Sequence, residues 1–537
     1  MKVILVSGGV LSGLGKGITA SSIGRVLRAR GVKVTAMKID PYLNFDAGTL
    51  NPFEHGEVFV LDDGGEADLD LGNYERFLDT NLTSDHVMTT GKVYGSVIEK
   101  ERQGHFLGKT VQIIPHITNE IKSMISSVGI KSGAEVVIVE LGGTVGDIES
   151  MPFLEAARQM HSEMGHENVL FVHTTLVPAL GALKEQKTKP TQHSVRELRG
   201  IGIQPDVIVA RSERPLDEGA KRKIALFCDV PLEAVVSAPD AKSIYQVPIF
   251  LEEQGLTDYL LSRMGMGPPK NGLKDWKAYL DKVMNPKHQV KVLLVGKYMD
   301  QHDSYMSHYE ALTHAGAELD TRVQFLRVEA EEIQKEESRR MLQEADGVLI
   351  PGGFGSRGVE GKIEAIRYAR ENRVPFLGVC LGFQLATVEF ARDVLQMHDA
   401  NSTEFDPHTS HPVIDLLPEQ KNVTKMGGSM RLGAQQVLIE KGSRAEELYH
   451  SLDIMERHRH RYEVNPHYID RLQEKGLRYT GRSPDGKKME ILELDGHPFF
   501  VGSQFHPEFK SRPRRPAPMH FGLVRAALEH SKGPGKQ

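Results

Sequence analysis

The sequence predicts an α/β protein built from two doubly wound domains, each with a parallel sheet covered by helices. Short runs rich in Val, Ile and Leu recur between longer helix-like segments and lack the polar alternation of a half-solvated sheet. A stretch bracketed by Pro and Gly, residues 265–289, separates two series of such runs. The chain of 537 residues is also longer than one ordinary hydrophobic core supports, which favours two domains.

The expected strands follow in two series. The first series covers residues 2–6, 31–39, 135–141, 168–177 and 206–210, and the second covers 290–296, 347–353, 374–380 and 497–505. From these series we predict a first domain at 1–266, a linker at 267–289, a second domain at 290–527 and a flexible tail at 528–537.

Composition excludes several classes of protein. Lys and Arg number 66 against 72 Asp and Glu, and this net charge of −6 is mixed along the chain, so we expect neither nucleic acid nor a membrane as a partner. The two cysteines, Cys228 and Cys380, are too few and too far apart for a disulfide framework and indicate a reducing, cytoplasmic compartment. No apolar run approaches the roughly 18–20 residues of a membrane span, and the N-terminal run is too short for a signal peptide.

A glycine-rich loop follows the first expected strand. Residues 7–19, SGGVLSGLGKGIT, join a strand to a helix, so backbone N–H groups, the helix N-terminus and Lys16 can bind a phosphate. The loop departs from the usual pattern because five residues, not four, separate Gly9 from Gly15, and because Gly17 replaces the hydroxyl residue after the lysine. The alternative interpretation is a strand-to-helix turn without a ligand.

The missing hydroxyl requires another ligand for Mg²⁺, a cation that takes oxygen ligands and often only one or two carboxylates. Glu140 ends the expected strand EVVIVE, at the sheet edge where ligands of parallel sheets collect. Asp70 is the second candidate. Because its neighbours are also acidic, a solvated acidic loop is the alternative there: Asp62, Asp63, Glu66 and Asp68.

Cys380 stands between two glycines in GVCLG, residues 378–382, after an apolar run and before an expected helix. This is the form of a nucleophile elbow with Cys in place of Ser, in which a sharp turn exposes the nucleophile and the helix N-terminus favours the thiolate. The alternative is an ordinary buried cysteine.

A base and an oxyanion hole are also available in the second domain. His506 and Glu508 of SQFHPEF follow the last expected strand and complete a Cys-His-Glu triad, since a triad depends on geometry rather than on chain order. The PGGFG loop at 351–355 can direct N–H groups near Gly352 at a developing negative charge, beside the N–H of Leu381. Together these residues predict acyl transfer through a thioester.

The three motifs PGGFG, GVCLG and FHPEF resemble a class I, triad-type glutamine amidotransferase domain. With SGGVLSGLGKG, MKIDPYLN, DLDLGNYERF, ELGGTVGDIES and KTKPTQHS ahead of them, nearly the whole chain resembles the CTP synthase family. The resemblance implies a P-loop-type synthetase domain followed by a class I glutaminase domain. It also implies ATP-dependent amination of UTP to CTP through a 4-phosphorylated intermediate, with ammonia released from L-glutamine and channelled between the sites.

The resemblance implies a role for each matching residue. Cys380, His506 and Glu508 would be catalytic, and glutamine would contact Gly352, Leu381, Gln384, Glu404 and Arg461. ATP would lie at Ser12, Gly13, Leu14, Gly15, Lys16, Gly17, Ile18, Lys38 and Asp70, with Mg²⁺ on Asp70 and Glu140. UTP or CTP would contact Asp147, Ile148, Glu149, Lys187, Thr188, Lys189, Pro190, Thr191, Gln192 and Lys223.

The resemblance further implies GTP as an allosteric activator, CTP as a feedback inhibitor, and a homotetramer, a dimer of dimers that can polymerise into filaments. Two other interpretations stay open: a P-loop amidotransferase of cobyrinate type that amidates a carboxylate, and a regulatory or filament-forming ATPase whose second domain binds partners. The basic stretch ERHRHRYEVN is too short for a nucleic-acid patch and is flanked by Glu456 and Glu463, which favours a solvated or glutamine-site loop.

Overall fold

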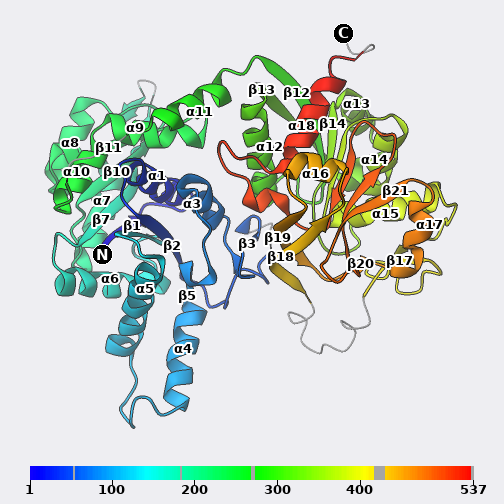
Figure 1. The fold of residues 1–537 in the computed structure, drawn as a ribbon. Coiled ribbons are helices and arrows are strands. Elements are labelled where there is room, and N and C mark those ends of the chain that lie inside the picture. The colour runs from blue at the N-terminus through cyan, green and yellow to red at the C-terminus, as the bar shows by residue number, and fades with distance from the viewer. Residues whose placement is uncertain (52–54, 182–183, 268–271, 417–429, 534–537) are drawn as a thin grey trace. The chain divides into compact units, whose positions relative to one another are not determined.

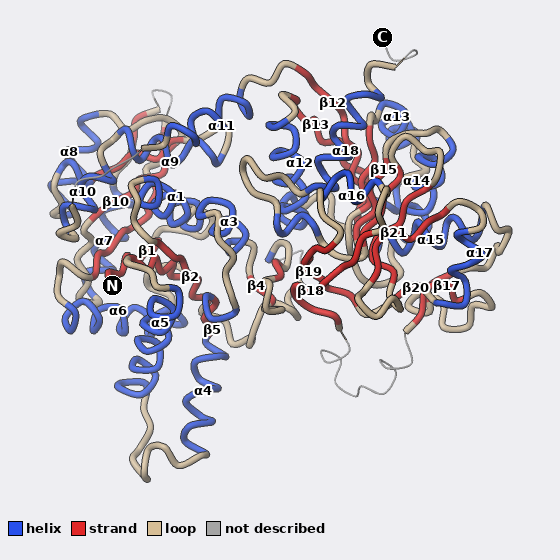
Figure 2. Tube along the Cα trace, in the orientation of Figure 1, coloured by secondary structure: helices blue, strands red, loops and turns tan. Residues whose placement is uncertain are grey.

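The computed structural model describes residues 1–51, 55–181, 184–267, 272–416 and 430–533. The chain folds into two compact units (Figure 1). The first unit contains residues 1–49 and 70–280, and the second contains residues 50–69 and 281–537. Both units combine helices with a large sheet, so the predicted α/β class is confirmed (Figure 2).

The first unit is built on a seven-stranded sheet in which neighbouring strands are parallel. The strand order is β11 (Val235–Pro239), β10 (Val207–Ser212), β7 (Val169–Leu176), β1 (Lys2–Gly8), β6 (Val136–Leu141), β2 (Val34–Asp40) and β5 (Val87–Thr89). The central strands are buried along their whole length, which explains why their sequences are continuous apolar runs.

Helices pack on both faces of this sheet. Val137 and Val139 of β6 belong to the core of one face, whereas Ile138 between them points towards Gly24 on the other. The first face packs against α4 (Thr90–Arg102), α5 (Thr118–Ser132), α6 (Met151–Met164) and α7 (Lys189–Gly200). The remaining elements are α1 (Lys16–Ala29), α3 (Asp70–Leu78), α8 (Glu218–Cys228), α9 (Val247–Glu253), α10 (Leu256–Arg263), α11 (Lys274–Met284) and the hairpin of β8 (Ala179–Leu180) and β9 (Glu185–Gln186).

The carboxyl ends of β1, β6 and β2 meet at one edge of this sheet. β1 runs into the loop before α1, β2 ends at Asp40, and β6 carries Glu140 immediately before its last residue. β1 lies beside β6, and β6 lies beside β2, so residues that are distant in the sequence come together at this edge.

The second unit is built on a nine-stranded mixed sheet. Its order is β13 (Thr321–Glu329), β12 (His288–Gly296), β14 (Gly347–Ile350), β15 (Phe376–Val379), β23 (Phe500–Ser503), β22 (Met489–Leu494), β21 (Leu477–Arg482), β18 (Arg431–Ile439) and β19 (Asp453–His460). The pairs from β13 to β23 are parallel, and the pairs from β23 to β19 are antiparallel. The sheet therefore departs from the all-parallel arrangement that we predicted, because short connections such as 483–488 can join only antiparallel neighbours.

Two helical layers enclose the parallel part of this sheet. Val348 and Phe376 face α14 (Val359–Glu371) and α15 (Leu381–Asp393), while Leu349 and Leu377 face α12 (Met306–Glu318) and α18 (Pro518–His530). The other elements are α13 (Glu336–Glu344), α16 (Arg444–Tyr449), α17 (Ile469–Gln473) and a small sheet of β16 (Asn401–Ser402), β17 (Pro412–Asp415) and β20 (Glu463–Val464).

Residues 50–69 belong to the second unit although they lie in the first half of the sequence. They form a hairpin of β3 (Phe59–Val60) and β4 (Glu66–Ala67), which lies against β19. Arg457 of β19 is fully buried there, donates to the backbone oxygen of Val60 over 3.0 Å and pairs with Asp62 at 2.6 Å. The first unit therefore differs from the continuous domain that we predicted at 1–266.

The predicted linker and tail are also partly ordered elements. α11 lies within the linker, where Trp276 and Tyr279 are buried and the indole N–H of Trp276 donates to the backbone oxygen of Tyr245 over 2.8 Å. The predicted tail begins inside α18. Linker residues 268–271 and tail residues 534–537 lie outside the described residues. Within the described ranges, no helix combines the length and apolar character that a membrane crossing requires.

Candidate active sites

The predicted phosphate loop joins β1 to α1. Ser12, Gly13, Leu14 and Gly15 lie in the loop, and Lys16, Gly17 and Ile18 form the first turn of α1. Gly15 precedes the helix with a φ of 79°, a left-handed conformation that glycine adopts readily. No side chain of the described residues caps the N-terminus of α1, and its first N–H groups open onto the loop as a phosphate site requires.

Lys16 folds back over the end of β1. A Cβ on Gly8 would lie 2.6 Å from Lys16 Cδ, so glycine at position 8 makes room for the lysine side chain. The ammonium group donates to the backbone oxygen of Gly143, in the loop after β6. Burial lowers the pKa of Lys16. The lysine therefore lies at the sheet edge, between the phosphate loop and the loop after β6.

Lys38 gathers carboxylates from three elements. Its Nζ atom contacts Asp70 at the start of α3, and lies 3.0 Å from Glu140 Oε1 and 3.9 Å from Asp40 Oδ1. The hydroxyl of Tyr74 donates to the second oxygen of Glu140. Burial and the neighbouring Asp70 raise the pKa of Glu140, and burial raises that of Asp40 to about 6. The cluster thus holds more carboxylate than one lysine neutralises.

Asp70 explains why Gly17 replaces the usual hydroxyl residue. A Cβ on Gly17 would lie 2.0 Å from Asp70 Oδ1, closer than side chains approach. The carboxylate therefore lies against the first turn of α1, where the Ser or Thr of the usual loop would project. Gly17 in the phosphate loop therefore leaves the space that the Asp70 side chain of α3 occupies.

The residues predicted to hold Mg²⁺, Asp70 and Glu140, are brought together by Lys38. Asp40 adds a further carboxylate that the sequence analysis did not assign. Carboxylate oxygens beside a phosphate loop are the donor set that Mg²⁺ prefers, so these residues fit that ion. Asp40 could have been found by the rule that identified Glu140, since it also ends a parallel strand at this edge.

The first group of predicted pyrimidine residues lies in the loop after β6. Asp147 accepts from a backbone N–H within this loop over 2.7 Å, and the side chains of Ile148 and Glu149 are exposed. Gly143 of the same loop accepts from Lys16. This group therefore adjoins the phosphate loop.

The second group lies between β9 and the first turns of α7: Lys187, Thr188, Lys189, Pro190, Thr191 and Gln192. Thr191 is buried and donates to the last backbone oxygen of β7 over 3.1 Å, which fixes the turn on the sheet. Lys187 pairs with Glu185 at 2.6 Å, and Lys223 of α8 acts on the same carboxylate. Among the described residues, no hydrogen bond or ion pair joins these lysines to residues 147–149.

A cavity of about 390 Å³ opens beside the phosphate loop. Gly13 and Leu14 line one side, and the ends of β7, β10 and β11 line the other, where Arg211 and Asp240 pair at 3.0 Å. Neither Arg211 nor Asp240 belongs to a sequence motif, and neither was predicted to have a function. The available signal was topological, since these strands end at the edge that the phosphate loop occupies.

Cys380 lies at a sharp turn between β15 and α15. Its φ of 51° and ψ of −99° place a non-glycine residue in strained backbone, which is the geometry of a nucleophile elbow. A Cβ on Gly378 would lie 2.6 Å from the backbone oxygen of Gly382, and one on Gly382 would lie 2.2 Å from that of Ile350. The two glycines therefore allow the strand and helix to approach closely enough to form the turn.

His506 and Glu508 lie beside this elbow, after β23. His506 Nδ1 donates to Glu508 Oε1 over 2.7 Å, while Nε2 makes no hydrogen bond within the described part of the chain. A Cβ on Gly352 would lie 2.9 Å from the His506 ring and 3.5 Å from Cys380 Cβ. The PGGFG loop, the thiol and the imidazole therefore converge on one space, and Leu381 begins the helix that opens onto it.

The histidine and the carboxylate shift each other's pKa. Burial lowers the pKa of His506, but the Glu508 carboxylate and the nearby Cys380 outweigh burial and raise it to about 10. Burial opposes ionisation of Glu508, yet His308 and His506 outweigh it and lower the pKa to about 2. Near neutral pH the pair is therefore an imidazolium held by a carboxylate.

The other predicted glutamine residues surround the PGGFG loop and the elbow. Glu404 accepts from the N–H of Gly355 over 2.8 Å, and burial raises its pKa against the opposing charges of Lys297 and Arg461. Gln384 lies in the first turns of α15 and donates to Gln504 Oε1 over 3.1 Å.

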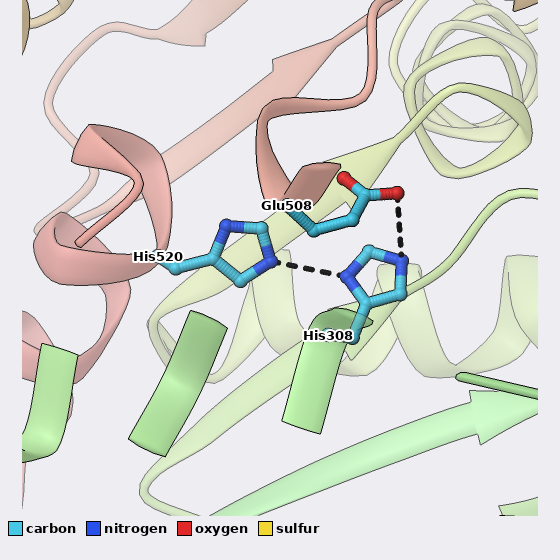
Figure 3. Close-up of side chains that lie close together, drawn as sticks. All are labelled: His308, Glu508 and His520. Carbon is cyan, nitrogen blue, oxygen red and sulfur yellow. Dashed lines mark hydrogen bonds and ion pairs between the residues drawn. The ribbon is translucent and has the colours of Figure 1, made fainter. Parts of the chain in front are cut away.

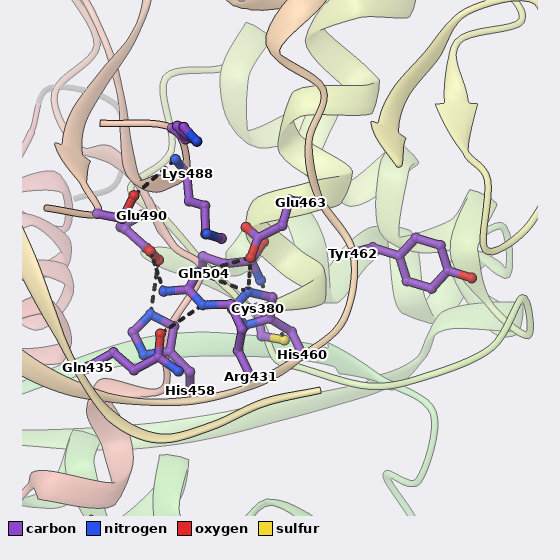
Figure 4. Close-up of polar contacts among 12 residues, drawn as sticks. Cys380, Arg431, Gln435, His458, His460, Tyr462, Glu463, Lys488, Glu490 and Gln504 are labelled. Atoms are coloured by element: carbon purple, nitrogen blue, oxygen red, sulfur yellow. Dashed lines mark hydrogen bonds and ion pairs between the residues drawn. The ribbon is translucent and has the colours of Figure 1, made fainter. Parts of the chain in front are cut away.

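A buried ionic network lies near Cys380 (Figure 4). It consists of Arg431, His458, His460, Glu463 and Glu490. Arg431 bridges the two carboxylates over 2.9 and 2.7 Å, and each carboxylate contacts one of the histidines at 2.9 Å. The interpretation of ERHRHRYEVN as a loop is wrong for this part, because residues up to His460 form β19. Its histidines are buried because carboxylates from other strands pair with them.

Two lysines lie beneath the PGGFG loop. Lys297 donates to the backbone oxygen of Phe354 over 2.7 Å. Lys362 of α14 is fully buried, its ammonium has no hydrogen-bond partner among the residues described, and burial lowers its pKa to about 7. A Cβ on Gly353 would lie 3.8 Å from Lys362 Nζ. Neither lysine belongs to a sequence motif, so neither was predicted.

Two family models match the chain, one in each half. The model of the CTP synthase N-terminus matches residues 2–266, and the model of class-I glutamine amidotransferase matches residues 301–526. The first half of the chain thus resembles a synthetase domain, and the second half resembles a domain that releases nitrogen from glutamine. The class of protein is an ATP-dependent ligase that takes its nitrogen from glutamine.

Curated relatives extend over nearly the full length. A CTP synthase from Methanopyrus kandleri is 59% identical over 530 residues, covering 98% of this chain and 99% of that protein. One from Pyrococcus furiosus is 59% identical over 532 residues, covering 99% and 98%. The chain belongs to the CTP synthase family, whose members use ATP to aminate UTP to CTP. Among solved structures, the glutaminase domain of Trypanosoma brucei CTPS with bound acivicin is 38% identical, covering 46% of this chain and 97% of that chain, with a TM-score of 0.43.

Proposed function

We propose that Cys380 is the nucleophile of the glutamine-hydrolysing site and that the edge around Lys16 and Lys38 is the synthetase site. The observation that carries the first assignment is the strained cysteine of the elbow, with the His506–Glu508 pair beside it. The reaction requires both sites. The O4 oxygen of UTP is a poor leaving group until ATP converts it to a phosphate ester, and ammonia near neutral pH is mostly protonated unless it is released inside the enzyme.

In the glutaminase site, Cys380 Sγ attacks the side-chain carbonyl carbon of glutamine, and the electron pair of the C=O bond moves to oxygen. N–H groups near Gly352 and that of Leu381 stabilise this oxyanion. His506 gives its proton to the amide nitrogen, the C–N bond breaks, and ammonia leaves a thioester. Water then attacks the thioester and gives a proton to His506 as base; the C–S bond breaks, glutamate leaves and Cys380 returns as the attacking thiolate beside the imidazolium, while Glu508 keeps the imidazole oriented.

The remaining glutamine contacts follow from charge. Glu404 suits the α-ammonium group of glutamine and Arg461 suits its α-carboxylate, while Gln384 is placed to hold the reacting side chain. The contact of Glu404 with Gly355, the last residue of the PGGFG loop, supports this assignment, because that loop also adjoins the thiol and the imidazole.

In the synthetase site, the loop from Ser12 to Ile18 and the Lys16 ammonium would bind the phosphates of ATP, and Lys38 would neutralise charge on the transferring phosphoryl group. Asp70 and Glu140 would hold Mg²⁺, which when bound offsets the charge of the phosphates. The contact between Asp70 and the first turn of α1 supports this arrangement. The cavity beside the loop has the place and size to receive the base of ATP.

UTP, and CTP as the feedback inhibitor, would bind Asp147, Ile148, Glu149, the segment Lys187–Gln192 and Lys223. The lysines suit a triphosphate. The family relationship supports a site completed by a second subunit of a homotetramer, a dimer of dimers.

The same family relationship supports allosteric activation by GTP, inhibition by CTP and assembly of tetramers into filaments. The cysteines are free and buried, which supports a reducing, cytoplasmic location.

The test measures CTP formation from UTP, ATP and Mg²⁺, with either glutamine or ammonium chloride, for the parent, Cys380→Ala and Cys228→Ala. We expect all three proteins to use ammonium, and Cys380→Ala alone to lose glutamine. Cys228 is the matched control, because it is the other free, buried cysteine. Glutamine-dependent CTP formation by Cys380→Ala would show that Cys380 is not the nucleophile. Glutamine hydrolysis by the parent without CTP from either nitrogen source would remove the synthetase assignment.

A further inference from the structure

Two buried histidines extend the triad behind Glu508 (Figure 3). His308 lies on α12 and His520 on α18. His308 Nε2 lies 3.4 Å from Glu508 Oε1, and His308 Nδ1 lies 3.0 Å from His520 Nε2. All three residues are at most 3% exposed. The reaction proposed above uses neither histidine.

We propose that His308 is a positioning residue for glutamine hydrolysis, which donates a second hydrogen bond to Glu508 and is held in the donating tautomer by His520. This inference rests on the proposed roles of Cys380, His506 and Glu508. It adds a series of hydrogen bonds that runs from His506, through Glu508, to α12 and α18.

The carboxylate sets the direction of each hydrogen bond. An ionised Glu508 only accepts, so His308 must present its Nε2–H, which leaves Nδ1 as an acceptor. His520 must then donate from Nε2, and its own Nδ1 has no partner in the described structure. Burial lowers the pKa of His308 and, with His308, lowers that of His520 to about 3. Both rings are therefore neutral near neutral pH. Only one direction of donation, from His520 to His308 and from His308 to Glu508, is then compatible with these contacts.

Glu508 has a physical need for a second donor. Its Oε1 accepts from His506 and also lies 3.4 Å from His308 Nε2, whereas Oε2 makes no hydrogen bond to the described residues. A buried carboxylate with one donor is poorly compensated and free to rotate. The donor on α12 fixes the orientation of the carboxylate, and the carboxylate in turn fixes the imidazole ring.

The test compares His308→Leu with His308→Gln in the full-length protein. Leu removes the donor, so we expect kcat for glutamine hydrolysis to fall about tenfold while KM for glutamine stays within about twofold. Gln carries a donor and an acceptor on one terminal amide, so it can replace both hydrogen bonds of His308 and should restore most of kcat. CTP formation from ammonium should be unchanged in both variants.

His520→Leu provides a second approach that leaves the donor in place. It removes the group that fixes the tautomer of His308, so we expect a smaller loss of kcat, about threefold. His497→Leu is the control, because His497 is also buried in the second unit but binds the backbone oxygen of Ala369 instead of the triad. We expect it to lower the melting temperature without lowering kcat.

Several outcomes would overturn the inference. Parental kcat in His308→Leu, or equal loss in His308→Gln and His308→Leu, would show that the donor is irrelevant. If His308→Leu does not fold, parental kcat in His520→Leu would have the same meaning. Inhibition of the parent by micromolar Zn²⁺ that His308→Gln abolishes would instead identify a metal site. Cys380→Ala, assayed in parallel, separates this failure from that of the proposed function, because glutamine hydrolysis by that variant would remove the triad itself.

Discussion

At the scale of single residues, the first turn of α1 and the first residue of α3 are packed so closely that a Cβ at position 17 would lie 2.0 Å from the Asp70 carboxylate. The glycine is therefore a requirement of the Asp70 carboxylate, and any residue larger than glycine must displace it. Through Lys38, the position of Asp70 is tied to that of Glu140. The absence of a side chain at position 17 thus leaves room for the Asp70 carboxylate beside Lys38.

Gly17→Ser, which restores the residue of the usual phosphate loop, should lower ammonium-dependent CTP formation by roughly 100-fold, since displacement of about an ångström has this effect on positioned groups. Glutamine hydrolysis, a property of the other unit, should persist. Gly95→Ser in α4 is the control, because a Cβ there meets no atom within 4 Å. A parental rate for Gly17→Ser would show that the place of Asp70 is unimportant.

Local motifs located Lys16, Cys380, His506 and Glu508, because each stands at a strand end within a recognisable spacing. The structure brings the last three together, as the motifs predicted. Residues such as Lys362, His308 and His520 left no such signal. Their significance comes from burial against elements that are far away in the sequence, and a histidine or lysine on a helix otherwise resembles a surface residue.

At the scale of elements, the loop between β14 and α14 presents two adjacent glycines that face different surroundings. A Cβ at Gly352 would enter the space between the imidazole and the thiol. A Cβ at Gly353 would make only ordinary contacts, the nearest at 3.6 Å to Leu381. The loop can therefore be tested one residue at a time.

We expect Gly352→Ala to lower glutamine hydrolysis by roughly 100-fold, because the added methyl group occupies the place of the reacting amide. Gly353→Ala should retain most of the activity, since it keeps the backbone N–H and meets no close atom. The assay is glutamate release, with ammonium-dependent CTP formation as the internal standard. Equal activity of the two variants would contradict the geometry of this loop.

The parallel strands were predictable because they are buried on both faces and are therefore apolar throughout. The antiparallel strands β18, β19, β21 and β22 were not. β19 contains Glu456, Arg457, His458 and His460, all of them buried, and its sequence resembles a solvated loop. These side chains are buried by pairing with charges from other strands, which a single segment of sequence does not reveal.

At the scale of the whole molecule, residues 50–69 leave the first unit and fold with the second. The sequence could not place this boundary, because the acidic residues of the segment are equally typical of a solvated loop and its contacts are with residues far along the chain. Glu57 accepts from the Ser307 N–H over 3.0 Å, and Asp62 pairs with Arg457. The backbone oxygen of Arg457 accepts from the N–H of His506 over 2.8 Å. Arg457 therefore connects residues 50–69 to the triad.

Asp62→Asn should therefore affect the glutaminase although it lies in the first half of the sequence. Loss of the charge partner of a buried arginine should lower the free energy of unfolding by about 1–2 kcal/mol, a value reduced from that of a fully buried pair because Asp62 is partly exposed. Thermal unfolding and glutamine hydrolysis would measure the effect. Asp63→Asn, at the exposed neighbouring position, is the control, and equal melting temperatures for the two variants would refute the prediction.

Because residues 50–69 fold with the second unit, they also determine how the gene can be recombined with those of its relatives. A single crossover within residues 267–289 would not exchange a complete glutaminase, because the hairpin of β3 and β4 would still come from the other parent. Arg457 and Arg459 of one parent would then meet the residues that the other parent carries in place of their partners Asp62 and Glu66. Functional chimeras should therefore require crossovers at both ends of residues 50–69 as well as in the linker, so that the inherited segment and β19 share one ancestry.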